Sequence, residues 1–349
     1  MILPGSQIFN LILLIFGMLC WGVWANTFRM TSKWRFELYY FDFAIGAGLA
    51  ALLIGFTFGS QGWDGFSMID DLRLAGRRQE AYALGAGMAF NLGNMLIVGA
   101  LSIAGVTVSY LIGLNLMLTT GMVITYFTSP SGNGTLLAVG AVLALASAGM
   151  LAVSSRLHSL ARLVVLMREG KTKTTRKVVS IKGLLLAIFG GIVAAAYYPL
   201  VNMAREGENG LGPYALGLFF AIGVVFSTAL YNLFFLNLPV QGEPLELSAY
   251  FKGKAKSHWL GLLGGALWYC GLISTLILAR AEGKNILPTF SIRLIMLGAV
   301  AVGTLIGLFR WKEFEGATGN VKTYLTVALA LFAFGMLGLS LSSGFSTGG

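Results

Sequence analysis

The chain has 349 residues, of which 56% are hydrophobic and only 11% are charged, and its mean hydropathy is +0.79. Soluble domains carry about 25% charged residues, so this composition excludes a soluble enzyme and a disordered or fibrous protein. The 47 glycines are about twice the ordinary share, which is typical of closely packed membrane helices. Apolar runs of about 20 residues disfavour a β-barrel, whose strands alternate in polarity.

The sequence predicts an all-α integral membrane protein with ten transmembrane helices, because each apolar run has the roughly 20 residues that a span needs. In chain order, the expected spans are 7–28, 38–59, 81–103, 107–128, 134–154, 183–204, 212–237, 257–279, 287–309 and 322–342. No Lys or Arg precedes the first run, so we interpret it as a span rather than a cleaved signal peptide. Almost nothing separates the third and fourth spans, which predicts a tight turn at Gly105.

Lys and Arg are concentrated on one side of these spans. Roughly 17 of them fall on the side that holds residues 155–182 and roughly 6 on the other side. The positive-inside rule therefore predicts a cytoplasmic 155–182 loop and places both termini outside, in the cell (inner) membrane. The net charge of +10 is explained by these loops, so we do not expect a nucleic-acid partner.

The two halves of the chain share short motifs in the same order. The matching pairs are 43–46 with 220–223, 87–93 with 265–271, and 149–151 with 335–337. These matches predict a duplication, with 1–154 as the first half, 155–182 as a basic linker and 183–349 as the second half.

Five spans in each half would invert the second half relative to the first. Inverted repeats are typical of secondary transporters, in which the binding site lies near the membrane midplane between the halves. A duplicated channel or scaffold without transport activity is the alternative.

Four segments resemble the ureide permease family. They are Trp21–Ala25 followed by Leu38–Asp42, then Thr120–Phe127, Leu260–Trp268 and Trp311–Phe314. The resemblance implies the fold of the drug/metabolite transporter (DMT) superfamily, with ten helices in two inverted five-helix halves, and uptake of ureides or related heterocycles. Sugar permeases of the same superfamily are similar enough to remain an alternative.

The resemblance is incomplete in the central loop. Ureide permeases of plants are said to carry a Walker A motif there, whereas Val165 stands here where the first glycine of that motif is required. We therefore interpret the loop as a basic segment near anionic lipid, with a plain solvated charge run as the alternative.

Polar and aromatic side chains inside the spans are the candidate substrate-binding residues, because polar groups in hydrocarbon need a partner or a wet cavity. They are Trp21, Trp24, Asn91, Asn94, Asn115, Thr119, Tyr198, Asn202, Trp268, Tyr269 and Arg293. Amides and aromatic faces suit a small, neutral, flat, polar solute such as allantoin, a nucleobase or a sugar. The alternatives are helix–helix hydrogen bonds for the Asn residues, lipid-interface anchoring for the Trp residues and snorkelling for Arg293.

Asp42 is the one acid predicted inside a span, near the cytoplasmic end of the second helix. A carboxylate there suits a proton that binds and leaves in each transport cycle, so H⁺ is an expected partner beside the solute. A salt bridge to Arg29 or Arg35 is an equally good interpretation.

The sequence contains no motif for an enzyme, a metal or a cofactor. His158 and His258 are expected in separate cytoplasmic loops, and Cys20 and Cys270 fall inside apolar runs. The favoured function is therefore a proton-coupled permease working by alternating access. An exporter of drugs or metabolites and a non-transporting membrane subunit are the alternatives, and the oligomeric state, exact solute and direction stay open.

Overall fold

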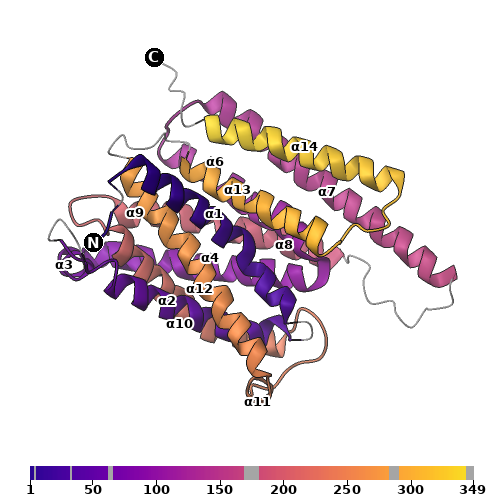
Figure 1. The fold of residues 1–349 in the computed structure, drawn as a ribbon, viewed down its shortest axis with the longest axis horizontal. Helices are drawn as coiled ribbons and strands as arrows, with labels where there is room; N and C mark the ends of the chain where they lie inside the picture. Colours follow the sequence, from indigo (N-terminus) through magenta and orange to yellow (C-terminus); the bar gives the residue numbers. More distant parts are fainter. Residues whose placement is uncertain (4, 32–33, 62–65, 169–180, 283–290, 343–349) are drawn as a thin grey trace.

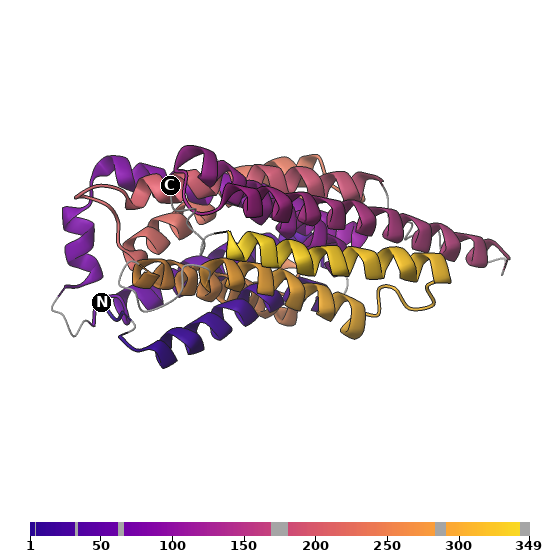
Figure 2. The same ribbon diagram turned by 90° about the horizontal axis from the view of Figure 1, so that it is seen from above.

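The computed structural model describes residues 1–3, 5–31, 34–61, 66–168, 181–282 and 291–342. Ten helical segments in these residues are long and apolar enough to cross a membrane. They run side by side in one elongated bundle, as Figures 1 and 2 show. The chain therefore has the architecture of a multi-pass membrane protein.

Seven of the spans are single helices and three are composite. The first three are α1 (Gln7–Met30), α2 (Phe36–Phe56) and α4 (Arg77–Ala104). The fourth combines α5 (Val106–Val108), the π-helical segment η1 (Ser109–Leu114) and α6 (Asn115–Thr128). The fifth is α7 (Gly134–Arg168), and the sixth combines α8 (Ile181–Ala195) and α9 (Tyr197–Arg205).

The remaining spans follow the same plan. They are α10 (Pro213–Asn237), α12 (Ala255–Glu282), α13 (Ser291–Leu305) continued by the π-helical η3 (Ile306–Arg310), and α14 (Gly319–Leu341). Two short helices, α3 (Met68–Leu74) and α11 (Ser248–Phe251), lie between spans. All ten expected spans are thus confirmed as helices, with ends that differ mostly by a few residues.

The linker expected at 155–182 is the main difference. Helix α7 continues to Arg168 because no Gly or Pro interrupts the sequence after Gly149, and Figure 2 shows this extension projecting beyond the other helices. Residues 169–180 lie outside the described residues. The predicted turn is confirmed, since Gly105 has a φ of 96° between α4 and α5.

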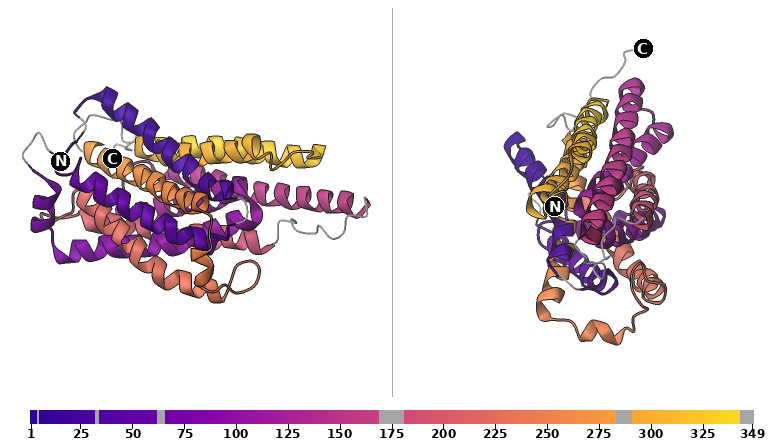
Figure 3. Two further views of the ribbon diagram at one scale, coloured as in Figure 1. Left: turned by 60° about the horizontal axis from the view of Figure 1, so that its bottom comes forward. Right: turned by 90° about the vertical axis from the view of Figure 1, so that its right-hand side faces the viewer.

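The bundle has two distinct ends. We call the end where α1 begins at Gln7 and α14 ends at Leu341 the terminal end, and the end where α7 ends at Arg168 and α8 begins at Ile181 the linker end. Figures 1 and 3 show these two ends at opposite extremes of the bundle.

The most extensive helix contacts join the two halves of the chain. Helix α7 packs along α14, α1 and α2 both pack on α12, and α4 packs on both α8 and α10. Smaller contacts join α1 to α13, α6 to α8 and α2 to α10. The two halves are therefore interleaved rather than set apart as separate domains.

Glycines bring the α2 and α12 backbones into direct contact. A Cβ atom on Gly46 would lie 2.1 Å from the carbonyl oxygen of Leu262, and one on Gly265 would lie 1.9 Å from that of Phe43. No other residue fits at these two positions without moving a helix, which explains part of the high glycine content.

The α4 and α10 helices meet in the same way. A Cβ atom on Gly87 would lie 2.1 Å from the carbonyl oxygen of Phe220, and one on Gly223 would lie 2.3 Å from that of Leu84. These glycines are the ones that the first two repeated motifs align. The third match behaves differently, because Gly335 packs against α7 whereas Gly149 has open space around it.

Candidate functional site

Six buried aromatic rings meet where spans from both halves converge, near the middle of α4 and α12. This central aromatic cluster consists of Trp21, Phe43, Phe90, Tyr197, Phe220 and Trp268. The ring centroids of Phe90 and Trp268 are 5.1 Å apart. Phe43 lies 5.7 Å from Trp268, and Phe220 lies 5.7 Å from Phe90. The cluster thus joins α1, α2, α4, α9, α10 and α12 through ring contacts.

Several buried polar atoms at and beside this cluster have no hydrogen-bond partner among the described residues. They are the indole nitrogens of Trp21, Trp24 and Trp268, the hydroxyl of Tyr269 and Oδ1 of Asn94. A buried polar group without a partner costs about 1–3 kcal/mol. Most of these atoms are hydrogen-bond donors, for which a carbonyl oxygen is a suitable acceptor.

Four residues predicted to bind the solute lie here, and their role in binding stays a prediction. Trp21, Trp24, Trp268 and Tyr269 are all buried in one neighbourhood. Asn94 joins it through Tyr40, whose hydroxyl accepts a hydrogen bond from Nδ2 of Asn94 at 2.8 Å.

Asn91 has a different environment, in which its amide is fully engaged. Its Oδ1 accepts a hydrogen bond from Tyr40 at 2.9 Å, and its Nδ2 donates to the hydroxyls of Ser227 at 2.8 Å and Thr228 at 2.9 Å. The carbonyl of Val224 lies 3.1 Å from the same nitrogen. Asn91 thus ties α4 to α2 and α10, which matches the helix–helix alternative stated above.

Asn115 and Thr119 also bond within the protein. Nδ2 of Asn115 donates to the carbonyl of Ala144 at 2.9 Å, and Thr119 donates to Oδ1 of Asn115 at 3.3 Å. This pair joins α6 to α7.

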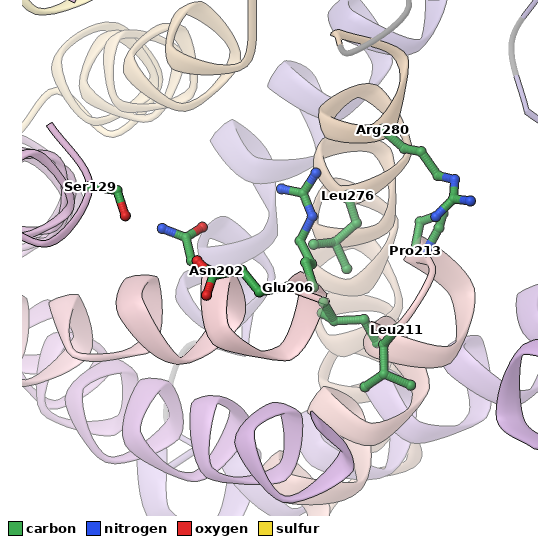
Figure 4. Close-up of a pocket in the computed structure, with 9 residues that line it drawn as sticks. Ser129, Asn202, Glu206, Leu211, Pro213, Leu276 and Arg280 are labelled. Carbon is green, nitrogen blue, oxygen red and sulfur yellow. The ribbon is translucent and has the colours of Figure 1, made fainter. Parts of the chain in front are cut away.

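Asn202 lines a pocket of about 330 Å³ at the terminal end. Figure 4 shows its walls, which come from Ser129 just after α6, from α9 and the loop that follows it, and from α10 and α12. The polar residues of this terminal pocket are Ser129, Asn202, Arg205, Glu206 and Arg280. Arg205 donates a hydrogen bond to the carbonyl of Ala279 at 3.0 Å, which joins α9 to the end of α12.

Tyr198 and Arg293 lie between helices rather than in that pocket. The hydroxyl of Tyr198 lies 3.1 Å from Sδ of Met296. Arg293 donates to the carbonyl of Leu339 at 3.0 Å and to the hydroxyl of Ser342. Arg293 therefore ties α13 to the end of α14.

Asp42 is buried near the linker end and has two polar partners. Its carboxylate accepts a hydrogen bond from the hydroxyl of Tyr250 at 2.6 Å, and Nδ1 of His258 lies 2.9 Å from its Oδ2. The two arginines considered as partners pair elsewhere. Arg29 lies 4.0 Å from Glu313, and Arg35 lies 2.7 Å from Glu37.

His258 was expected in a loop, and that expectation was wrong. It lies in the first turn of α12, which begins at Ala255. Gly261 lets this part of α12 approach α2, because a Cβ there would lie 2.3 Å from Cβ of Asp42. His158 likewise lies inside α7, within the helical extension that the sequence assigned to the linker.

Tyr250 belongs to α11, outside the spans. Burial, together with the neighbouring Asp42 carboxylate, raises the pKa of Tyr250 well above its ordinary value. Its hydroxyl therefore stays protonated at neutral pH and donates to Asp42.

Sequence reasoning did not assign four members of the aromatic cluster, Phe43, Phe90, Tyr197 and Phe220, to the site. Three of them stand inside the repeated motifs, so the repeat itself was the available signal. His258 and Tyr250 carry no comparable signal, because their link to Asp42 depends on the packing of α12 against α2.

Among the residues that the structure describes, no group of three or more His, Cys, Asp or Glu side chains is placed to hold a metal ion. Cys20 and Cys270 are free thiols. The polar chemistry of the site therefore rests on indoles, phenols, amides and the Asp42–His258 pair.

Comparison with protein-family models finds no match for this chain. Comparison with curated proteins finds none either. Among solved structures, the chain is similar to one described as "Crystal structure of protein", at 17% sequence identity and a TM-score of 0.46, with 95% of this chain and 96% of that chain covered.

Proposed function

We propose that the chain is a secondary transporter that carries a small, neutral, polar solute by alternating access, with uptake coupled to protons through Asp42. The solute class is a ureide, nucleobase or related heterocycle, as the resemblance to ureide permeases implies. A sugar, or export of a metabolite or drug, is the alternative outcome of the experiment below.

The observation that carries this proposal is the set of unpartnered donors around the central aromatic cluster. A protein built only for stability would pair or replace the indole nitrogens of Trp21 and Trp268, since each unpaired donor costs free energy. A flat solute with carbonyl oxygens would stack on the rings and accept these hydrogen bonds. Binding would then offset the cost of these unpaired donors.

The helix contacts support an arrangement of two inverted halves of the DMT kind. The relation can be tested by exchanging each span of the first half with the span five places later. This exchange pairs α1 with α8 and α9, pairs α2 with α10, and pairs α4 with α12. The contact of α1 with α12 then becomes that of α8 with α4, and the contact of α2 with α12 becomes that of α10 with α4. The contacts of α7 with α14 and of α2 with α10 map onto themselves. A duplication would produce such a pattern, and an odd number of spans in each half would invert the second half relative to the first.

The glycine contacts support the same relation at atomic detail. Gly46 against Leu262 corresponds to Gly223 against Leu84 under that exchange. The contact of Gly265 with Phe43 corresponds likewise to that of Gly87 with Phe220. The 5.7 Å ring contact of Phe43 with Trp268 has its counterpart in the 5.7 Å contact of Phe220 with Phe90.

Corresponding residues of α1 and α9 lie at the two ends of the bundle. At the linker end, the indole nitrogen of Trp311 donates to Oδ1 of Asn26 at 2.7 Å, which closes α1 against the loop after η3. At the terminal end, Asn202 and Arg205 stand at positions of α9 that correspond to Asn26 and Arg29 of α1, and they line the open pocket. Arg29 and Trp311 also line a pocket at the linker end, so these contacts do not fix the side from which a solute would enter.

The charge distribution supports a cytoplasmic linker end. Described basic residues at that end include Arg29, Arg35, Arg156, Arg162, Arg168, Lys182, Lys252, Lys254, Lys256, Arg310, Lys312 and Lys322. Those at the terminal end include Arg73, Arg77, Arg78, Arg205 and Arg280. Under the positive-inside rule, both ends of the chain face outward across the cell membrane, and the terminal pocket opens to the outside.

Transport into proteoliposomes tests the proposal. Radiolabelled allantoin, uracil and a hexose are offered separately, with and without an inward proton gradient, and protein-free liposomes serve as the control. Saturable uptake of allantoin or uracil that rises with the gradient supports the proposal. Hexose uptake alone would favour the sugar permease, and no saturable uptake in either direction of any of the three would overturn transport of this solute class.

A further inference from the structure

A second pocket, of about 300 Å³, lies at the linker end between α1, the α4–α5 turn, α7 and the loop after η3. Its size is at the lower limit of ordinary ligand pockets. Its ionisable side chains are Arg29, His158, Arg162, Lys312, Glu313 and Glu315. This linker pocket is separate from the terminal pocket and from the aromatic cluster, so the proposed transport does not account for it.

His158 is the most unusual member of the linker pocket. Only 5% of the residue is exposed, and neither ring nitrogen completes a hydrogen bond with the described residues. The backbone carbonyl of Glu313 lies near the ring without meeting that geometry. The ring stacks on Phe314 with centroids 5.3 Å apart, which fixes its orientation. The Glu313 carbonyl can serve one ring nitrogen, and the other nitrogen is costly to bury unless a ligand or water completes it.

The acidic groups of the linker pocket are already occupied. Glu313 accepts hydrogen bonds from the backbone nitrogens of Val106 and Thr107, both at 2.8 Å, and lies 4.0 Å from Arg29. The negative charge of this carboxylate therefore compensates the partial positive charge of the N–H groups at the start of the fourth span. It is not available to a ligand in the pocket.

The basic side chains of the linker pocket can still form hydrogen bonds or ion pairs with a ligand. Glu315 lies 3.4 Å from Lys312, and both side chains are largely exposed. Arg29 lies over the Trp311 ring, 5.5 Å from its centroid, with its guanidinium partly free to bind. Arg162 stands one helical turn after His158 on the same face of α7 and has no ion pair among the described residues.

We infer that the linker pocket binds an oxyanion, a phosphate group held between the guanidinium groups of Arg29 and Arg162 with His158 completing its hydrogen bonds. Arginine is the side chain best suited to phosphate oxygens. The phosphate has two possible sources, the headgroup of an anionic lipid or free phosphate, and basic pockets between membrane helices commonly bind lipid headgroups. This inference does not depend on the proposed transport.

Binding to the purified full chain in detergent tests the inference. Phosphatidylglycerol, phosphatidylcholine and inorganic phosphate are titrated separately, with native mass spectrometry and thermal unfolding as readouts. We expect one phosphatidylglycerol, or phosphate, to bind and raise Tm, whereas phosphatidylcholine does not. Binding of phosphatidylglycerol alone assigns a lipid headgroup, and competition by phosphate assigns a free oxyanion.

Two variants and a matched control locate the site. Arg162→Gln should weaken binding about tenfold or more, because it removes a charged hydrogen-bond donor. His158→Phe keeps a ring against Phe314 and should also weaken binding. Arg156→Gln removes a charge of α7 outside the pocket and should change nothing.

Three results would overturn the inference. One is equal binding of phosphatidylcholine and phosphatidylglycerol with no response to phosphate. Another is an equal loss in Arg156→Gln and Arg162→Gln, which would indicate only a general surface charge effect. The third is displacement of the bound anion by uracil or allantoin, which would make the pocket part of the solute pathway.

Discussion

Nδ1 of His258 lies 2.9 Å from Oδ2 of Asp42, across the contact between α2 and α12. Asp42 is the more deeply buried of the two, since 3% of its side chain is exposed compared with 25% of the His258 side chain. A proton that enters from the linker end would therefore meet His258 first. Under the proposed coupling, this order would make His258 a relay and Asp42 the coupling acid.

Asp42→Asn should leave solute binding intact and remove the dependence of uptake on the proton gradient, because the amide cannot gain or lose the proton. Uptake into proteoliposomes at several external pH values checks this. Glu37→Gln is a matched control, since Glu37 is a buried acid of the same helix that pairs with Arg35 instead. If Asp42→Asn keeps the pH dependence of the unmodified protein, Asp42 has only a structural role.

Trp268→Phe should reduce the apparent affinity for solute by about tenfold, in addition to the loss of thermal stability that a smaller ring causes at this fully buried position. The variant loses a donor worth about 1–1.5 kcal/mol to a bound solute, and that donor has no partner among the described residues. Initial uptake rates give the affinity, and Tm in detergent gives the stability. Trp259→Phe, at a position where 71% of the residue is exposed, is the control. A fall in Tm with unchanged affinity would make Trp268 a packing residue.

Asn91→Ala should lower the unfolding free energy by about 1–3 kcal/mol, because it leaves buried hydroxyl partners unpaired. Asn26→Ala should have a smaller effect, since its main loss is the single bond from Trp311. We also expect Asn91→Ala to weaken uptake more than Asn26→Ala. Tm measurements and uptake normalised to folded protein separate the two effects, and equal values in both assays would contradict the expected ranking.

Asp71 lies in α3, outside the spans, and its raised pKa predicts that the stability of the protein depends on pH. Burial raises the pKa of its carboxyl above 3.8, although the Gly212 N–H at 2.9 Å and Arg280 act in the opposite direction. The folded chain therefore binds this proton more tightly than the unfolded chain. The contribution to stability falls as pH rises from 3.8 through the folded pKa, and it is constant above that pKa.

Asp71→Asn removes this contribution. The Tm of the variant minus that of the unmodified protein should therefore increase as pH rises from about 4 to about 7. Differential scanning of both proteins over that range provides the measurement. Because Asp70 is unchanged in both, its own titration cancels in the difference. A Tm difference independent of pH would show that Asp71 titrates normally.

The spans were predictable because hydropathy is a local property of about 20 consecutive residues. The turn at Gly105 was predictable for the same reason, since too few residues separate two apolar runs. The extension of α7 to Arg168 was missed because basic residues were interpreted as the end of a span, although they are good helix formers.

The site was predictable only in part. Trp21, Trp268 and Asn94 follow from the rule that polar groups inside hydrocarbon need a reason. The same rule does not distinguish Asn91, whose hydrogen bonds to α10 depend on tertiary packing. His258 and Asp42 are separated by more than 200 residues, so only the helix arrangement brings them together.

The glycine contacts have a mechanical consequence. Where backbone carbonyl oxygens meet Gly46 and Gly265, α2 and α12 have no side-chain layer that could slide, and α4 and α10 are joined in the same way by Gly87 and Gly223. Each pair is therefore expected to move as a rigid body. If the proposed alternating access operates, exposure of the centre to either side of the bilayer would come from rotation of one pair against the other, about the contact between α2 and α10.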